Sequence, residues 1–579
     1  MNHSSHSSTP SGLARVWPVF AWLFSIWATF AHLGDFPLLS PDEGRNAEVA
    51  REMKVAGSWL VPTYDGATYL DKPAFFFKSA ALSLAALGDT EFAARLPSAL
   101  SALGILLILF AFCRRAYGQL TASLAIMIVA STPLFMAFSR IVIFDMMLAL
   151  FVCAAIFCAY LAEEREGETR RNWYLLATLA AGLATLVKGP VGFLVPLLVM
   201  SAFHLISGSR AAIRRFFSPL HIALFLAVVL PWFVGLSLAC PDFPYYGIMK
   251  ESIARFTTTE FRRTQPAYYY ALIIAGCFFS WSVVLPESMG LIFRERRRLS
   301  RPDRLFAVWA IVVVIFFSLS QSKLPGYILT GVIALGVLVA RVFAEALESR
   351  NTLSRRIVLR ASLGLAVSAC LLAIPLLLLM FAPESLAKPR WLTNEILEQF
   401  GSLLPGISIS LGITAVLALT AYGMKSPRFA VAAFLSFSVL LLTINFEVIP
   451  RHSSLKSARS LFDRLPTDLP ANTEFACNGC MPHGLPFYLG QPVTVFTADG
   501  NELTSNYVLF SLKSGKDWPD RLVPRDQMQN YVTSRTHPLF LMARNDRRPE
   551  LEMIAQQRGL SVTRLFSDYF GVLLPAAGH

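Results

Sequence analysis

Residues 361–381 read ASLGLAVSACLLAIPLLLLMF, an apolar run without a charged residue. A helix of about 20 apolar residues crosses the hydrocarbon core of a bilayer, so this run predicts a transmembrane helix. The whole chain of 579 residues is 55% hydrophobic and 15% charged, with a mean hydropathy of +0.52. This composition excludes a water-soluble protein and indicates an α-helical polytopic membrane protein.

Similar apolar segments recur along most of the chain, and we expect about 13 transmembrane helices. The first lacks a small-residue cleavage site after it, which favours a retained helix over a signal peptide. The expected spans are residues 16–34, 94–113, 119–139, 142–162, 172–187, 190–207, 217–240, 267–288, 304–320, 325–347, 357–381, 403–423 and 428–446.

Basic residues gather in every second connection between these spans. Such loops normally face the cytoplasm, so we expect a cytoplasmic N-terminus, a periplasmic C-terminus and a place in a bacterial inner membrane. The formal net charge of +13 then reflects topology and contact with anionic membrane lipids, and a nucleic-acid partner is not expected. The basic residues are Arg114, Arg115, Arg165, Arg170, Arg171, Arg210, Arg214, Arg215, Arg294, Arg296, Arg297, Arg298, Arg301, Arg304, Arg350, Arg355, Arg356, Lys425 and Arg428.

The pattern divides the chain into a transmembrane domain, residues 1–446, and a small periplasmic α/β domain, residues 447–579. Within the first, residues 35–93 form a periplasmic stretch with helices at the membrane surface. In the second, we expect strands at 492–496, 537–542 and 570–574 and helices at 457–465 and 549–558. Cys477 and Cys480 predict a short disulfide or plain thiols, or with His483 part of a metal site.

The periplasmic side carries acidic residues close to membrane exits. Asp145 lies near the start of an apolar helix, where a carboxylate is costly unless it has a function, or is stabilised by the helix dipole and Arg140. Asp42 and Glu43 follow Ser40 and Pro41. Ser40 as N-cap and Glu43 three residues later match a capping box, which explains Glu43 but leaves Asp42 as a candidate for function.

Cations share that side. Lys72, Lys188, Arg255 and Lys323 stand beside prolines or aromatic residues, and Tyr327 adds a hydroxyl. Any one of them is also explained by a long side chain reaching the interface. Together they suit a phosphate or pyrophosphate. Carboxylates beside such cations at a membrane surface favour transfer from a lipid-linked phosphate donor.

Several motifs resemble the bacterial aminoarabinose transferases (ArnT) and the related protein O-mannosyltransferases, which are GT-C glycosyltransferases that use a polyprenyl-phosphate sugar. The resemblance runs through most of the chain in a fixed order. The motifs are PDEGRNAEVAREM at 41–53, WLVP at 59–62, YLDKP at 69–73, RLPSAL at 95–100, KGP at 188–190, KLPGYIL at 323–329 and LPFYLG at 485–490.

The resemblance implies roles for individual residues. It makes Asp42 and Asp145 the catalytic-site aspartates, and it places donor-phosphate contacts on Lys72, Arg255, Tyr327 and Arg45. It also places Glu43, Asp71, Lys188 and Lys323 along the same cavity. The chain reads Asp71 where relatives commonly have Glu, and Glu251-Ser252 where they have Glu-His. These departures weaken the case for a divalent metal on Asp71, so no cofactor is expected to be required.

We therefore expect an inverting glycosyltransferase. Its donor would be a sugar on undecaprenyl phosphate, with 4-amino-4-deoxy-L-arabinose as the first candidate, and its acceptor lipid A or another periplasmic molecule. Transfer of another sugar, such as a hexose, to a protein hydroxyl or another glycolipid is the alternative within enzymes. A lipid or polysaccharide transporter is the alternative from another class, although the spans show no internal repeat.

Overall fold

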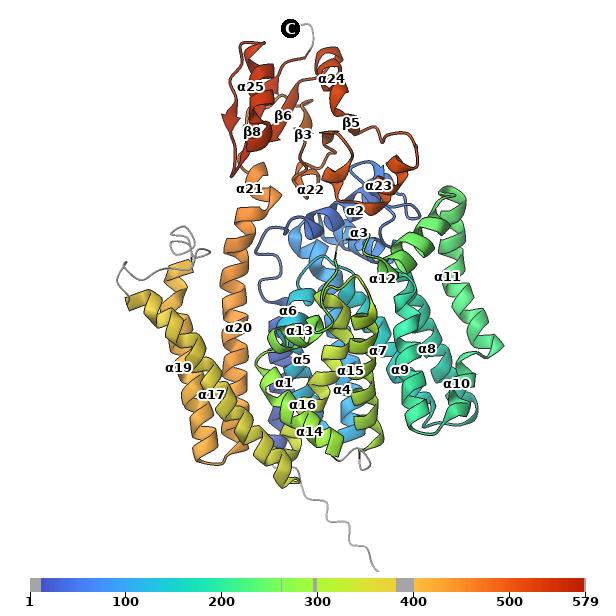
Figure 1. The fold of residues 1–579 in the computed structure, drawn as a ribbon, viewed down its shortest axis with the longest axis vertical. Coiled ribbons are helices and arrows are strands. Elements are labelled where there is room, and N and C mark those ends of the chain that lie inside the picture. Colours follow the sequence, from blue (N-terminus) through green and yellow to red (C-terminus); the bar gives the residue numbers. More distant parts are fainter. Residues whose placement is uncertain (1–11, 262, 295–298, 382–399, 577–579) are drawn as a thin grey trace, which may run out of the picture.

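The computed structural model describes residues 12–261, 263–294, 299–381 and 400–576 (Figure 1). The N-terminal tail up to residue 11 and the predicted basic residues Arg296, Arg297 and Arg298 lie outside the described residues. Most of the described chain is helical, and one small sheet forms the C-terminal end.

Long helices form the body of the protein. In the described part of the chain, eight are long and apolar enough to cross a membrane, or up to ten if two bent pairs each count as one span. These pairs are α5 with α6, bent by 70°, and α13 with the segment starting at Trp281, bent by 116°. The helices of the body are α1 (Gly12–Phe30), α4 (Glu91–Tyr117), α5 (Gln119–Ala130), α6 (Pro133–Ser139), α7 (Asp145–Ala162), α8 (Gly167–Lys188), α9 (Val191–Ile206), α10 (Arg210–Phe216), α11 (Pro219–Ala239), α13 (Tyr269–Cys277), η2 (Trp281–Val284), α14 (Leu285–Arg294), α15 (Arg301–Leu319), η3 (Pro325–Ile328), α16 (Leu329–Leu347), α17 (Thr352–Phe381), α19 (Leu404–Gly423) and α20 (Pro427–Lys456).

Each of the thirteen expected spans coincides with one of these helices or bent pairs. Three of them, α1, α8 and α9, fall short of the length or apolarity that a full crossing needs by itself. The polytopic helical architecture is confirmed, whereas the count of about 13 stays a prediction.

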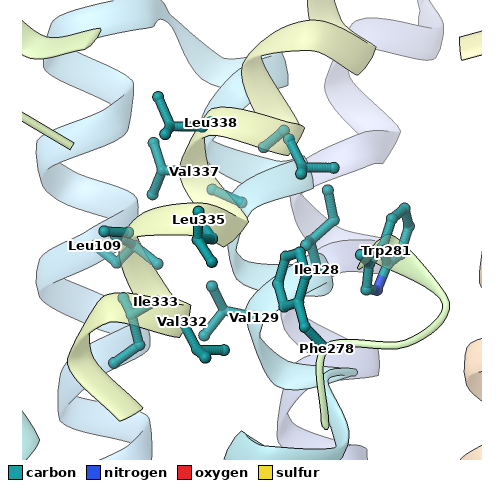
Figure 2. Packing of buried hydrophobic residues seen from close by; sticks show 14 of the residues in the cluster. Leu109, Ile128, Val129, Phe278, Trp281, Val332, Ile333, Leu335, Val337 and Leu338 are labelled. Atoms are coloured by element: carbon teal, nitrogen blue, oxygen red, sulfur yellow. The ribbon is translucent and has the colours of Figure 1, made fainter. Parts of the chain in front are cut away.

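The centre of the body is α16, whose most apolar window is 89% buried. Its side chains, Val332 and Ile333 among them, pack against Leu109 of α4 and Val129 of α5 (Figure 2). Burial of this kind contributes about 25 cal/mol per Å² of apolar surface relative to water. In contrast, the window of α11 is 6% buried and that of α17 is 17% buried, so their apolar surfaces face outward, as lipid contact requires.

The predicted basic connections lie at one end of the body. Figure 1 shows α10, α14 and the start of α17 at the end opposite the C-terminal domain. This separation agrees with a cytoplasmic basic face and a periplasmic C-terminus, an orientation that stays a prediction.

A cap of short elements lies between the body and the C-terminal domain (Figure 1). The first connection supplies α2 (Asp42–Ala56), the hairpin β1 (Thr63–Tyr64) and β2 (Ala67–Thr68), and α3 (Phe75–Leu87). A later connection supplies the π-helix η1 (Tyr245–Ala254) and the single turn α12 (Arg255–Thr257). Most of α2 is buried, and α3 buries one face, with Phe76, Phe77, Ala80, Ala81 and Leu84, so the cap is packed against its neighbours.

The C-terminal domain is a six-stranded sheet in the order β5-β4-β3-β6-β8-β7. The pairs among β5, β4, β3 and β6 are parallel, and β8 runs antiparallel to both β6 and β7. The predicted α/β character is confirmed. The strands are β3 (Glu474–Asn478), β4 (Thr494–Thr497), β5 (Leu522–Pro524), β6 (Leu539–Arg544), β7 (Thr563–Arg564) and β8 (Tyr569–Leu574), and the helices are α21 (Ala458–Phe462), α22 (Leu485–Leu489), α23 (Asn506–Lys513), α24 (Met528–Ser534) and α25 (Arg548–Gln556).

One feature near the domain border differs from the expectations, and a second decides between the alternatives for the cysteines. Helix α20 continues to Lys456, ten residues beyond the predicted border at 446. Cys477 and Cys480 are buried free thiols. His483 bonds the Tyr64 hydroxyl at 2.8 Å rather than joining the two cysteines. Of the alternatives for this motif, the structure has plain thiols.

Candidate active site

A cavity of about 710 Å³ opens in the upper half of the body, beneath the cap. Its charged and hydroxyl-bearing residues sit at helix ends: Asp145 begins α7 and Lys188 ends α8. Away from these charged helix ends the lining is apolar. Val152 on α7 and Phe225 on α11 are examples. Val152 lies seven residues below Asp145, which is about 10 Å along the helix axis. The cavity therefore suits a molecule with a charged head and an apolar tail.

One side of the cavity holds a cluster of three charges. Lys72, from the loop between β2 and α3, and Arg255, at the start of α12, both form ion pairs with Oε1 of Glu251 on η1. All three side chains are nearly buried, at 10–13% exposure. Burial lowers the pKa of Lys72 to about 8, and the charge of Glu251 opposes that shift. Two cations thus converge where the lining turns apolar, as a phosphate site requires.

A second ion pair belongs to the same cavity lining. The Lys188 ammonium donates to Oδ1 of Asp145 at 2.5 Å and lies over the rings of Phe144 and Tyr327, at 5.0 and 4.8 Å from their centroids. The alternative pairing of Asp145 with Arg140 is wrong. Arg140 donates instead to the carbonyl of Ala31 at 2.5 Å.

Asp42 lies outside the cavity lining, at the first position of α2. Its side chain is 62% exposed and forms an ion pair with Arg45. Arg45 also donates to Thr504 of the C-terminal domain, to Oγ1 at 2.6 Å and to the carbonyl at 3.2 Å. The expectation that Arg45 faces the donor phosphate does not fit this geometry, because its guanidinium holds Asp42 and Thr504 instead.

Glu43 does not line the cavity, contrary to expectation. It is buried against Arg95 in a two-pronged ion pair, with both N–O distances at 2.9 Å. Its carboxylate also accepts the backbone N–H of Leu39 at 2.9 Å and of Val142 at 2.8 Å. The predicted cap is only half right, since Pro41 rather than Ser40 occupies the N-cap and makes no side-chain cap bond. Glu43 therefore joins three segments of the chain.

Asp71 lines the cavity, but its oxygens face hydrogen-bond donors. It accepts from the Tyr246 hydroxyl at 2.8 Å and from the backbone N–H groups of Asn506 and Tyr507 at 3.0 and 2.7 Å. Such a carboxylate has little capacity left for a metal ion. The described residues contain no group of three or more His, Cys, Asp or Glu arranged for a metal.

Lys323 is another predicted site residue that does not line the cavity. Its ammonium is buried and donates to the carbonyl of Ser320 at 2.6 Å. Ser320 lines the cavity while Lys323 does not, so Lys323 supports the wall rather than facing a ligand.

Of the ten predicted site residues, six line the cavity and four do not. The lining residues are Asp71, Lys72, Asp145, Lys188, Arg255 and Tyr327; the others are Asp42, Glu43, Arg45 and Lys323. The roles assigned to them stay predictions, apart from the corrections above.

The sequence-based prediction omitted several residues that shape the site. Glu251 precedes Arg255 by four residues, so their pairing on one helix face was readable. Thr504 and Tyr507 reach the cap from more than 400 residues away, and no local signal reveals them. His483 is also close by, and burial lowers its pKa to about 3, so it stays neutral and does not serve as a cation.

Comparison with known proteins places this geometry in context. Residues 71–234 match the family model described as dolichyl-phosphate-mannose-protein mannosyltransferase. An undecaprenyl phosphate-alpha-4-amino-4-deoxy-L-arabinose arabinosyl transferase of Serratia proteamaculans is 30% identical over 332 residues, 57% of this chain. The matched segment spans 59% of the length of that relative. A protein of the same name from Photorhabdus laumondii is 27% identical over 409 residues, which is 70% of this chain and 71% of that one.

The fold is shared over almost the whole chain. The crystal structure of ArnT from Cupriavidus metallidurans bound to undecaprenyl phosphate superposes with a TM-score of 0.77 at 24% identity, covering 99% of this chain and 100% of that one. The apolar helices indicate a multi-pass membrane protein. Over part of its sequence and over nearly all of its fold, the chain is similar to these aminoarabinose transferases.

Proposed function

We propose that the protein transfers a sugar from undecaprenyl phosphate to lipid A or a related periplasmic acceptor, with 4-amino-4-deoxy-L-arabinose as the first candidate sugar. The observation that carries this proposal is the cavity, which joins a cationic end to an apolar body. Lys72 and Arg255 supply the cations, and Val152 and Phe225 belong to the apolar part. The names of the relatives support both the lipid carrier and the sugar.

The donor phosphate would bind where Lys72 and Arg255 converge, with Tyr327 and Lys188 in the same cavity lining. The acceptor oxygen forms a bond to the anomeric carbon while the bond from that carbon to the phosphate oxygen breaks. The electron pair of the broken bond stays on the phosphate, where the cations stabilise the growing charge. Attack opposite the leaving group inverts the anomeric centre.

Asp42 is the proposed base or orienting group for the acceptor. A hydroxyl acceptor gives its proton to Asp42, whereas a phosphate of lipid A is already anionic and needs only to be oriented. Because Asp42 is exposed beneath the C-terminal domain, it meets an acceptor arriving from the periplasmic side. Asp145 holds Lys188 in place in the cavity lining.

Transport is the weaker alternative. A transporter of this kind places its functional charges near the middle of the membrane, at the interface of paired repeats. The charged residues of this cavity instead sit at the ends of helices, next to the cap. The match to the mannosyltransferase family model makes transfer of a hexose to a protein hydroxyl the second candidate.

The test is transfer by the purified protein. Undecaprenyl phosphate carrying aminoarabinose is incubated with lipid A, and the product is followed by mass spectrometry. A hexose donor with a protein acceptor is run in parallel. Wild-type protein should modify lipid A, while Asp42→Asn and Lys72→Ala should lose most of the activity and Glu168→Gln, an exposed change on α8, should keep it. Full activity of both site variants would refute the site, and transfer to neither acceptor would refute the function.

A further inference from the structure

We infer that Glu251 is a tethered anion that occupies the phosphate position between Lys72 and Arg255, leaves when the donor binds and returns to displace the product. This inference rests on the proposed function and adds a residue to it. It assigns to Glu251 the control of phosphate affinity, a role distinct from that of the cations.

The contacts of Glu251 place it where a phosphate would sit. Both Lys72 and Arg255 direct their charged groups to the same oxygen, Oε1. In the described part of the chain, neither cation bonds any other carboxylate; Lys72 additionally donates to the backbone carbonyl of Asp71. Lys72 comes from the first connection, Glu251 and Arg255 come from the contiguous turns of η1 and α12, and all three meet in the cavity lining. A negatively charged group already occupies the cationic site.

The pairing leaves bonding capacity unused. Oε2 of Glu251 and Nε of Arg255 are buried and have no hydrogen-bond partner among the described residues. The Glu43–Arg95 pair differs, since both carboxylate oxygens and both facing guanidinium nitrogens are bonded. Unsatisfied buried polar atoms are costly. A phosphate has more acceptor oxygens than a carboxylate, in a wider arrangement, so it can accept from Arg255 and still reach Lys72.

The charge of the ligand changes during the proposed reaction. The donor is a phosphodiester with one negative charge, whereas the product is a phosphomonoester with about −1.5 to −2 charges at neutral pH. Two buried cations alone would hold the product more tightly than the donor, so product release would slow the cycle. A carboxylate tethered beside them competes with both ligands and, after release, compensates one of the two positive charges. Glu251 thus lowers the affinity of the site for the lipid phosphate and speeds release of the product.

Binding of undecaprenyl phosphate, without acceptor or sugar, tests the inference. It is measured in nanodiscs at a series of pH values below 8, because burial lowers the pKa of Lys72 to about 8 in the wild type and loss of the Glu251 charge lowers it further. Glu251→Gln should bind at least about tenfold more tightly than wild type, since it removes a competing charge from a poorly solvated site. The matched control is Glu260→Gln, which changes an exposed carboxylate paired with Lys250 and should bind as wild type does.

A second measurement guards against a misfolded variant and against a merely structural role. In Glu251→Ala, free acetate can enter the vacated position, so it should compete with undecaprenyl phosphate, whereas acetate should have little effect on wild type. In turnover, Glu251→Gln should lower both kcat and the KM for the donor, and it should strengthen product inhibition.

The possible failures point to different conclusions. Unchanged or weaker binding by Glu251→Gln, or insensitivity of Glu251→Ala to acetate, would overturn the inference and make Glu251 a support that holds the cations. Absence of undecaprenyl phosphate binding by wild type and by all variants would instead overturn the proposed function.

Discussion

Glu43 sits beside the best candidate for a catalytic carboxylate, yet we predict that it governs stability. The perturbation is Glu43→Gln, which preserves shape and removes the charge. The carboxylate accepts four hydrogen bonds, two from Arg95 and one each from the backbone N–H groups of Leu39 and Val142. A glutamine keeps one oxygen and turns an NH₂ group toward other donors. Arg95, which is fully buried, is left as an uncompensated charge.

The size of the effect follows from this burial. Breaking a buried ion pair by removing one partner typically costs about 3–5 kcal/mol. Arg95 retains carbonyl contacts with Leu33, Phe36 and Pro37, which soften the loss without replacing the charge. Glu168→Gln is the control, because its partner Arg171 is 55% exposed and 3.7 Å away. Exposed pairs of this kind contribute about 0–1 kcal/mol.

The assay is unfolding of the purified protein in detergent, followed by tryptophan fluorescence, for wild type and both variants. Glu43→Gln should unfold at clearly lower temperature and denaturant concentration, and Glu168→Gln should match wild type. The double variant Glu43→Gln with Arg95→Met should be less destabilised than the sum of the two single changes. A Glu43→Gln protein that unfolds like the control, or that retains stability but loses binding, would refute the structural role.

Three further predictions concern the site and its cap. Donor binding should weaken as pH rises through about 8, because Lys72, whose pKa burial lowers to about 8, is the charged form below that pH and neutral above it; binding that is flat from pH 6 to 9 would contradict this. Thr504→Val removes the Oγ1 that accepts from Arg45, so transfer should fall about tenfold through kcat with donor affinity kept; an unchanged rate would show that Thr504 does not position Asp42 through Arg45. Gly44→Ala would bring a Cβ to 2.5 Å from the His483 carbonyl oxygen, so the C-terminal domain should be cleaved faster in limited proteolysis; wild-type resistance would show that the contact can relax.

Much of the architecture could be predicted from the sequence. The length of an apolar segment indicates whether it can cross the membrane, and basic loops indicate the side on which a connection lies. Asp145 and Lys188 could be assigned to one membrane face. Asp145 begins an apolar helix and Lys188 finishes one, and the basic loops place both of these ends on the same side. Their direct pairing could not be predicted, since two helices can present their ends together in several orientations. For Lys72, which lies in a loop, the sequence predicted a cation on that face but not its pairing with Glu251.

The rest depended on contacts between distant segments. Arg45 looked like a phosphate ligand by its place in the motif, but its partner Thr504 lies in the C-terminal domain. Glu43 matched a capping pattern that explains one of its hydrogen bonds, to Leu39, and hides its pairing with Arg95. Local pattern identifies charged residues, whereas their partners follow from packing that single-sequence reasoning does not determine.

Helix α11 carries a final consequence. Its apolar window is only 6% buried, while Phe225, Val229 and Trp232 of the same helix line the cavity. A single layer of helix therefore separates the cavity from surrounding lipid. On the proposed function, a long-chain donor never has to enter water to reach the site, and the concentration that matters is its mole fraction in the bilayer. Diluting the donor with inert lipid should slow the reaction as effectively as removing it, even when its amount per volume is unchanged.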